Sequence, residues 1–231
     1  MSRRYKTILF VRFLGYFIFL TGLLSFLFVL GPVITAETSY RIDRVFGVKR
    51  QVTSAALPVK PGSTDEQSNQ GQSFGSVTPS ENSIIPLSTE FGIVIEKINA
   101  NAKVVANVDP TNERDYVKAL SAGVAEALGS TPPGVPGNLY LFSHSTDAPW
   151  NIIRFNAIFY LLRELEAGDR VIIFYNNIRY DYIVFDKQIV SPADVSYLTN
   201  RYDSPVLTLQ TCDPPGTLIN RLIVRARLVS S

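Results

Sequence analysis

The longest apolar stretch of the chain lies near its N-terminus, where no charged residue occurs from Phe13 to Ile34. As an α-helix this stretch would be about 33 Å long, which matches the hydrocarbon core of a bilayer. The apolar region of a cleaved secretory signal is shorter, about 7–15 residues. The pattern therefore favours an uncleaved membrane anchor over residues 13–34. A cleaved signal is the alternative, with Ile34-Thr35-Ala36 as a poor cleavage site.

Basic residues flank this span almost symmetrically. Four precede it and four follow it: Arg3, Arg4, Lys6 and Arg12 on one side, and Arg41, Arg44, Lys49 and Arg50 on the other. The positive-inside rule is therefore nearly tied, and long domains cross a membrane largely regardless of their charge. The amino terminus itself tips the balance inward. We expect residues 1–12 to be cytoplasmic, with a single-pass anchor in the cell membrane and everything after it outside.

Small and polar residues dominate between about Gln51 and Thr89. This stretch is rich in Ser, Gly, Pro, Gln and Asn and has few large apolar groups. Burial then cannot offset the entropy of folding, which predicts disorder. A coil of about 40 residues has an end-to-end distance of about 35 Å. We expect residues 35–90 to form a juxtamembrane segment and flexible linker, and residues 91–231 to form the folded domain.

Short runs rich in β-branched and aromatic residues dominate that domain. The clearest are "FGIVIEKI" from Phe91, "NLYLFSH" ending at His144, "PVLTLQTC" ending at Cys212 and "RLIVRARLV" from Arg221. The run "VIIFYNNIRYDYIVF" predicts a hairpin that turns at Asn176-Asn177, because asparagine tolerates the positive φ of a tight turn. Five or more short strands with few helices predict a mostly β fold, a closed or nearly closed barrel.

Helical spacing appears in two places. Thr111 or Asn112 can cap a short helix that carries three apolar residues on one side, Tyr116, Val117 and Leu120. Across residues 151–171, a second helix packed on the core is predicted by Phe155, Ile158, Phe159, Leu162 and Leu165. The run "SPADVSYL" allows one more helical turn.

Composition restricts the chemistry. The net charge is only +2, so nucleic acid is not an expected partner. Cys212 is the only cysteine and His144 the only histidine. A lone cysteine outside the cell indicates a reactive thiol or an intermolecular bridge. These two side chains cannot supply the usual ligands of a zinc site, and no dense carboxylate cluster occurs, so we expect no metal ion, calcium included, and no cofactor.

The order of the strands suggests how three polar side chains meet. If the last two strands pair as antiparallel neighbours, Cys212 at the end of one and Arg221 at the start of the next lie at the same end of the sheet. His144 also ends a predicted strand. If that strand pairs in parallel with the strand of Cys212, all three side chains converge at one mouth of the barrel.

Such a group is suited to acyl transfer. An unperturbed thiol has a pKa near 8.5, so only about 3% is thiolate at pH 7. An imidazole can take its proton or stabilise the anion, whereas a guanidinium is a poor base but a good donor to an oxyanion. Cys212 as nucleophile, His144 as acid and base, and Arg221 as oxyanion or substrate clamp form a coherent set.

Each of these residues also has a purely structural interpretation. A lone cysteine is often a small buried hydrophobe, and a lone histidine often lies at the surface or in a satisfied core. Arg221, Arg225 and Arg227 can simply form the solvated face of one strand. The residues alone leave both interpretations open.

A family resemblance favours the chemical interpretation. "TLQTC" resembles the TLxTC signature of sortases, and "RLIVRA" resembles the strand that bears the sortase arginine, which implies that role for Arg221. "GVAEALGSTPPGVPGNLYLFSHS" resembles the family's run up to the active-site histidine, which implies that role for His144. The resemblance extends from about Phe91 to Val229 and implies a closed eight-stranded barrel with a few short helices, preceded by the anchor and linker.

The sequence departs from the common family pattern around the histidine. Many sortases have glycine before it and arginine after it, whereas here it lies between Ser143 and Ser145, which predicts a different local loop. The "CDPPGT" loop resembles class D and class E-like sortases more than the best-known housekeeping enzymes.

The resemblance implies a membrane-bound transpeptidase. The Cys212 thiolate would attack the Thr–Gly carbonyl of an LPxTG-like sorting signal on a secreted protein and form a thioacyl enzyme. His144 would protonate the leaving amine, and Arg221 would hold the oxyanion or the substrate backbone. An amine from a cell-wall precursor or a pilin lysine would then resolve the thioester. Thr208 and Thr211 are weaker candidates for binding or supporting the substrate. Thr211 would support the oxyanion region or shape the substrate groove, or both are simply β-branched strand residues.

Two other functions remain open from the sequence. A cysteine peptidase on the outer membrane face would use the same groups but release its product to water. A non-catalytic, membrane-anchored barrel would use Cys212 only as buried filler.

Overall fold

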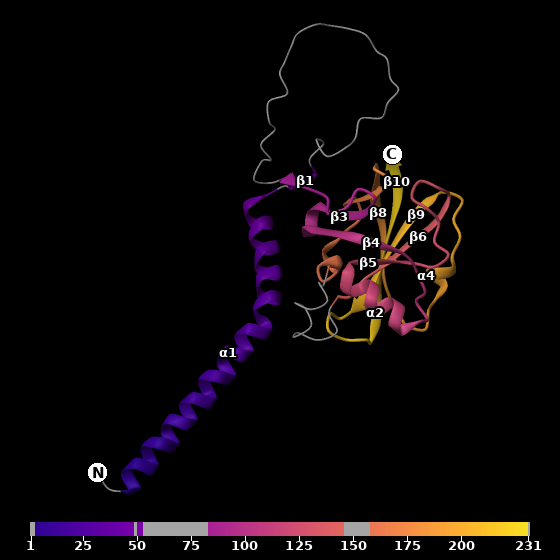
Figure 1. Cartoon of the computed structure of the whole chain (residues 1–231). Coiled ribbons are helices and arrows are strands. Elements are labelled where there is room, and N and C mark those ends of the chain that lie inside the picture. The colour runs from indigo at the N-terminus through magenta and orange to yellow at the C-terminus, as the bar shows by residue number, and fades with distance from the viewer. Residues whose placement is uncertain (1–2, 49, 53–82, 146–157, 231) are drawn as a thin grey trace, which may run out of the picture.

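The computed structural model describes residues 3–48, 50–52, 83–145 and 158–230 (Figure 1). Eight strands form a closed barrel beside one long N-terminal helix. The closed eight-stranded barrel with a few short helices is the fold expected from the family resemblance, and it is confirmed.

The barrel strands are not arranged in chain order. Around the barrel they run β10 (Asn220–Ser230), β8 (Ile178–Val190), β7 (Arg170–Tyr175), β3 (Phe91–Ile95), β4 (Ala100–Val108), β5 (Val124–Ala127), β6 (Gly137–Phe142) and β9 (Pro205–Asp213). Two neighbouring pairs, β4 with β5 and β6 with β9, are parallel, and the rest are antiparallel.

Side-chain alternation along the strands divides the apolar residues between two faces. Leu207 and Leu209 of β9 belong to the main core cluster inside the barrel, with Ile93 and Ile173. Tyr140 and Phe142 of β6 belong to a second cluster, which contains residues of helix α2 (Glu113–Ala122). The period of two therefore builds the interior and an outer wall from the same strands.

Two local predictions are confirmed, one of them with a correction. Asn176 and Asn177 have φ of 50° and 64° and join β7 to β8 as a two-residue hairpin turn. Asn112 caps α2, and its side chain accepts a hydrogen bond from the Arg114 amide. Val117, however, is 38% exposed. The helix instead buries Ala119 with Leu120, and Tyr116 packs against the same cluster. Val117 therefore lies at the margin of the inner face.

The end of α2 requires glycine for steric reasons. A Cβ added at Gly123 would lie 2.3 Å from the carbonyl oxygen of Lys103, so no larger residue fits where the helix meets β5. The absence of a side chain at Gly123 therefore lets the end of α2 lie directly against the backbone of β4.

The helix predicted over residues 151–171 is wrong where it can be compared. Residues 146–157 lie outside the described ranges, and the remainder forms turns and a short 3₁₀-helix, η4 (Leu162–Glu164). Phe159, Leu162 and Leu165 are fully buried. Their spacing of three residues suits the 3₁₀ period as well as the α-helical one, so periodicity alone could not separate the two.

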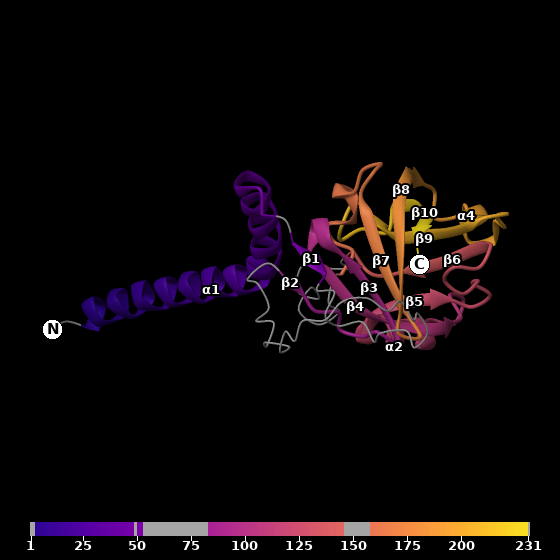
Figure 2. The same cartoon turned by 90° about the horizontal axis from the view of Figure 1, so that it is seen from above.

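Helix α1 (Arg3–Phe46) extends well past the predicted anchor. Its segment Arg4–Phe28 is long and apolar enough to cross a membrane, and none of the most apolar part is buried against the protein. Helix α1 bends partway along its length (Figures 1 and 2). Gly31 and Pro32 lie inside it, and an interior proline removes a helical hydrogen bond and bends a helix.

The C-terminal part of α1 packs on the barrel. Tyr40 is 9% exposed and joins the main core cluster. Glu37 forms an ion pair at 2.9 Å with Arg163, whose backbone belongs to η4. Residues of the predicted juxtamembrane segment therefore continue the helix and attach it to the folded domain.

The predicted linker is ordered at both ends. Strands β1 (Gln51–Val52) and β2 (Ser83–Ile84) pair in parallel. Val52 and Ile84 are buried in a cluster with Phe174 and two other barrel residues. The expected disorder of Gln51–Thr89 does not hold for these ends, because each contributes one apolar side chain to that cluster. Residues 53–82 lie outside the described ranges.

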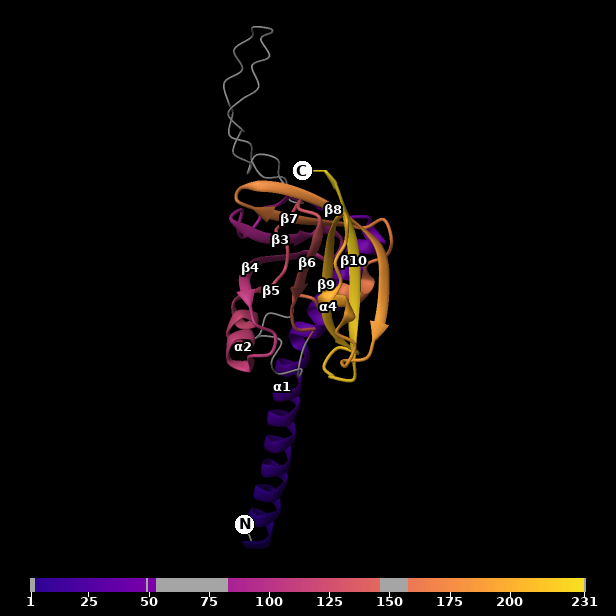
Figure 3. The same cartoon turned by 90° about the vertical axis from the view of Figure 1, so that its right-hand side faces the viewer.

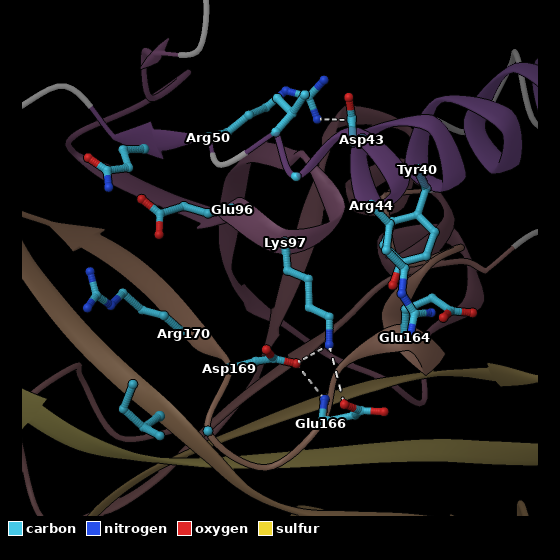
Figure 4. A pocket seen from close by; sticks show the side chains of 15 residues that line it. Tyr40, Asp43, Arg44, Arg50, Glu96, Lys97, Glu164, Glu166, Asp169 and Arg170 are labelled. Atoms are coloured by element: carbon cyan, nitrogen blue, oxygen red, sulfur yellow. Dashed lines mark hydrogen bonds and ion pairs between the residues drawn. The ribbon is translucent and has the colours of Figure 1, made fainter.

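A polar hollow of about 550 Å³ separates the end of α1 from the barrel (Figure 4). It contains charges of both signs, and several pair with one another. Lys97 lies 2.8 Å from Asp169 and 3.8 Å from Glu166, while Arg50 pairs with Asp43. None of these pairs joins α1 to the barrel, whereas the contacts of Tyr40 and Glu37 do.

Reversing the charge at Glu37 should loosen α1 from the barrel. Glu37→Arg places two cations together in a partly exposed site, and we expect amides of residues 37–46 to exchange hydrogen two- to five-fold faster, in keeping with about 0.5–1 kcal/mol for such a pair. Hydrogen exchange of the full chain in detergent measures this. The control, Arg41→Ala, removes only the 74%-exposed partner of the same carboxylate and should change little. Equal exchange in both variants would contradict the docking role of the pair.

Candidate active site

Strand β9 lies between the two strands that carry the other candidate residues. It pairs antiparallel with β10, and Cys212 is directly opposite Arg221. It pairs in parallel with β6, and Gln210 is opposite Phe142. Because His144 and Cys212 each follow that pair by two residues, the two strands lead them to the same edge of the barrel. The strand pairings that the sequence argument required are therefore present.

Cys212, His144 and Arg221 line one cavity of about 340 Å³. The polar residues that line it with them include Ser143, Gln210, Thr211 and Asp194. Apolar residues form much of its remaining wall: Pro110, Tyr116, Leu120, Phe142, Pro192, Val195, Leu198 and Leu218. The cavity thus combines an extended apolar lining with a few polar groups, the usual composition of a ligand site.

Thr211 supports the loop that carries the histidine. Its side chain faces away from the outer wall, is 3% exposed and donates a 2.9 Å hydrogen bond to the carbonyl oxygen of Ser143. The Ser143 amide donates in turn to the Gln210 carbonyl. Two hydrogen bonds therefore fix the backbone directly before His144 to the backbone directly before Cys212.

Thr208 has a different role, away from the cavity. It is fully buried and donates a 2.7 Å hydrogen bond to Oδ1 of Asn138. Asn138 donates through Nδ2 to the carbonyl of Tyr197 in helix α4 (Ser196–Thr199). Thr208 therefore helps to hold α4 on the barrel wall, and Leu198 of that helix lines the cavity.

Tyr140 and Gln210 form a polar pair at the cavity that the sequence argument missed. The Tyr140 hydroxyl donates to Oε1 of Gln210 across β6 and β9. Burial raises the pKa of Tyr140 well above its usual value, while the nearby Arg221 guanidinium opposes that shift. Tyr140 therefore stays neutral in the physiological range. The period of two could have signalled the pair, since Gln210 and Cys212 share one face of β9.

Arg221 is held near its own turn. Its Nη1 donates to the carbonyl oxygens of Asn220 at 3.2 Å and Leu218 at 3.4 Å. A guanidinium carries five N–H donors in a planar fork, so these two bonds through a single nitrogen orient the group without using its full capacity.

Asp194 brings a negative charge to the edge of the cavity. The side-chain and backbone hydrogen bonds from Ser196 hold the pKa of Asp194 below its usual value. Within the described ranges, no group of three or more His, Cys, Asp or Glu side chains is placed to hold a metal ion. That no metal or cofactor is needed stays a prediction.

Comparisons with known proteins agree on one family. The family model described as Sortase domain matches residues 93–229, more than half of the chain. Sortase C-1 from Actinomyces oris matches with 24% identity and a TM-score of 0.53, over 63% of this chain and 76% of that one. A Clostridium perfringens sortase D5 transpeptidase matches with 23% identity and a TM-score of 0.50, over 61% and 79%.

A sortase A from Corynebacterium diphtheriae, a lid mutant, matches with 24% identity and a TM-score of 0.51, over 62% of this chain and 72% of that one. At these identities the likeness shows the fold. Sortases named A, C and D match about equally well, so the class D or E-like assignment stays a prediction. No curated protein matches the chain.

The two threonines should be distinguishable by substitution with valine, which keeps the shape and removes the hydroxyl. Each variant leaves a buried acceptor without its donor, so we expect each to lose about 1–3 kcal/mol of unfolding free energy. Only Thr211→Val should also shift the imidazole resonances of His144, because only Thr211 bonds to the preceding residue. The single histidine makes the proton NMR spectrum unambiguous. Equal shifts in Thr208→Val and Thr211→Val would contradict the separation of roles.

Proposed function

The chain belongs to the sortase family, whose members are cysteine transpeptidases, and on this premise we propose that it transfers secreted proteins bearing an LPxTG-like signal to an amine acceptor. The single observation that carries the residue assignment is the cavity that Cys212, His144 and Arg221 share, with Arg221 directly across from Cys212 on the neighbouring strand. The folded unit that does this is proposed as residues 91–231.

In the first half-reaction, the Cys212 thiolate attacks the carbonyl carbon of the scissile Thr–Gly bond. The tetrahedral oxyanion receives hydrogen bonds from Arg221, which lines the same cavity as Cys212. The C–N bond breaks as His144 gives a proton to the leaving amine. The products are a thioester on Cys212 and the released C-terminal fragment.

In the second half-reaction, the acceptor amine attacks the thioester carbonyl. His144 takes a proton from that amine, the C–S bond breaks and the Cys212 thiolate is restored. The acceptor is a cell-wall precursor or a pilin lysine. Water in place of the amine would give a peptidase, the alternative that uses the same groups.

The apolar wall of the cavity suits the apolar residues of the sorting signal. Phe142 of β6, Leu120 of α2 and Leu198 of α4 come from three different elements that meet beside Cys212. Binding leucine and proline side chains there would place the following Thr–Gly bond at the polar end. Thr211 acts as a positioning residue through Ser143, and Thr208 acts through Asn138 and α4.

The proposed location is the outer face of the cell membrane. The apolar segment Arg4–Phe28 supports a single-pass anchor by its length and composition. The N-terminal residues before the anchor would be cytoplasmic, and the barrel extracytoplasmic.

Substitutions in the cavity should separate the three roles. With a fluorogenic sorting peptide and the full chain in detergent, Cys212→Ala should abolish the thioacyl adduct seen by mass spectrometry. His144→Ala and Arg221→Ala should lower kcat/KM by about 10²–10⁴-fold, as loss of an acid–base group or an oxyanion donor does. Arg227→Ala is the matched control, because this arginine of β10 stacks on Phe185 away from the cavity and should keep normal turnover.

An amine acceptor added to the same assay distinguishes transfer from hydrolysis. Transfer predicts that the acylated amine replaces the hydrolysed peptide as the main product. Hydrolysis of the peptide that the added amine does not reduce would favour the peptidase. Normal turnover by the Cys212→Ala variant would contradict the proposed mechanism.

A further inference from the structure

The docked part of α1 sets the direction in which the barrel faces. The apolar N-terminal segment of α1 continues beyond one end of the barrel, and the C-terminus of the chain lies at the other end (Figures 1 and 3). Strand β10 finishes near the C-terminus and starts at the end nearer that apolar segment. Cys212 and Arg221 lie at this starting end, so the candidate active site faces the same side as the anchor.

Helix and strand geometry limits the distance between the end of the span and the site. From Phe28, where the candidate span ends, to Phe46, where α1 ends, a helix rises about 27 Å. Strand β9, which leads to Cys212, has nine residues and is about 30 Å long. Both lengths are upper limits on height, because α1 bends within this stretch and barrel strands are tilted. Since α1 runs beside the barrel, the mouth that carries Cys212 lies on the side nearer the span (Figures 1 and 3).

Apolar side chains are exposed at this end of the barrel. Four of them, Ile189, Val195, Leu218 and Ile219, are between 60% and 68% exposed. Ile189 is opposite Leu222, next to Arg221, and Val195 and Leu218 line the cavity itself. We call these four residues the apolar rim. Exposed apolar residues occur elsewhere on the barrel too, and the rim differs from them in its position at the end of the barrel nearer the anchor.

We propose that the apolar rim rests on the lipid surface, so that the candidate active site opens directly at the outer face of the membrane. The occupant is the bilayer itself, because the rim continues the surface that the docked anchor already brings to the membrane. This inference rests on the proposed anchor. A sorting peptide or an amine acceptor would then reach the cavity along the membrane surface, between rim and lipid.

The contacts between α1 and the barrel fix the direction in which the mouth of the barrel faces. The core position of Tyr40 and the Glu37–Arg163 ion pair attach the helix to the barrel. A tether alone would let the barrel turn in any direction and keep the rim at the membrane only part of the time.

Depth-dependent tryptophan quenching tests the proposal on the full chain. The background is Trp150→Phe, which removes the only native tryptophan. Ile219→Trp then reports on the rim, and Ile178→Trp is the matched control, because Ile178 is 49% exposed and begins β8 at the opposite end of the barrel. Both are reconstituted in phosphatidylcholine–phosphatidylglycerol vesicles with a spin label near the top of the acyl chain.

We expect quenching of the Ile219→Trp variant at least twofold greater than that of the Ile178→Trp variant, with a blue-shifted emission. Adding Glu37→Arg should reduce this difference, because it loosens the docked helix without touching the rim. Circular dichroism and thioester formation confirm that each variant is folded.

Two failures are distinguishable. If the full chain does not float with the vesicles, the proposed anchor fails. If it floats but both tryptophans are quenched equally or not at all, the anchor stands and the rim proposal is overturned. A blue-shifted emission of the Ile219→Trp variant that appears only at high protein concentration would assign the rim to a contact with a second copy. One that appears only with sorting peptide would assign it to the substrate. Either result would also overturn the rim proposal.

Discussion

The register of β9 between its two neighbours is the constraint on which the candidate site depends. One strand pairs antiparallel with β10 and parallel with β6, and this mixed pairing brings chain positions 144, 212 and 221 to one edge. A shift of one residue would exchange the faces of Cys212 and Thr211 and turn the thiol toward the barrel interior. The register is fixed from the inside, because Leu207 and Leu209 fill the barrel on the opposite face of the same strand.

Hydrogen bonds at the end of β9 keep it aligned with the chain after β6, beyond the last residues of the sheet. The ladder with β6 ends near Phe142, yet the Ser143 amide and carbonyl still pair with Gln210 and Thr211. The buried Thr211 hydroxyl replaces a missing backbone donor where the strands diverge. A threonine there is thus more than a β-former, whereas Thr208 performs a related task for α4 on the other face of the strand.

Much of this was predictable from the sequence, and the reasons for the exceptions are physical. Alternating apolar residues and the Asn176-Asn177 turn predicted a closed or nearly closed barrel, and the family resemblance supplied its eight strands. The order of the polar strand ends predicted the convergence of the three candidates only if two strand pairings were assumed, and both are present. The 158–165 segment was not predictable, because burial every three residues fits both α and 3₁₀ periods. Part of the cavity wall also escaped prediction, since Leu120 and Leu198 reach it only through the packing of α2 and α4 on the barrel.

The docked helix was the least predictable feature, because its contacts join residues more than one hundred positions apart in the chain. Glu37 and Tyr40 follow an apolar span and precede a polar stretch, and nothing local distinguishes them from solvated juxtamembrane residues. Their effect on function depends on orientation more than on affinity. Anchoring already raises the effective concentration of membrane-bound partners, but a freely turning barrel would present its site to them only in a fraction of its orientations. A docking free energy of only about 1.4 kcal/mol would favour the docked state about tenfold over the undocked one, so a few contacts at the helix–barrel junction are enough to keep the site directed at the membrane.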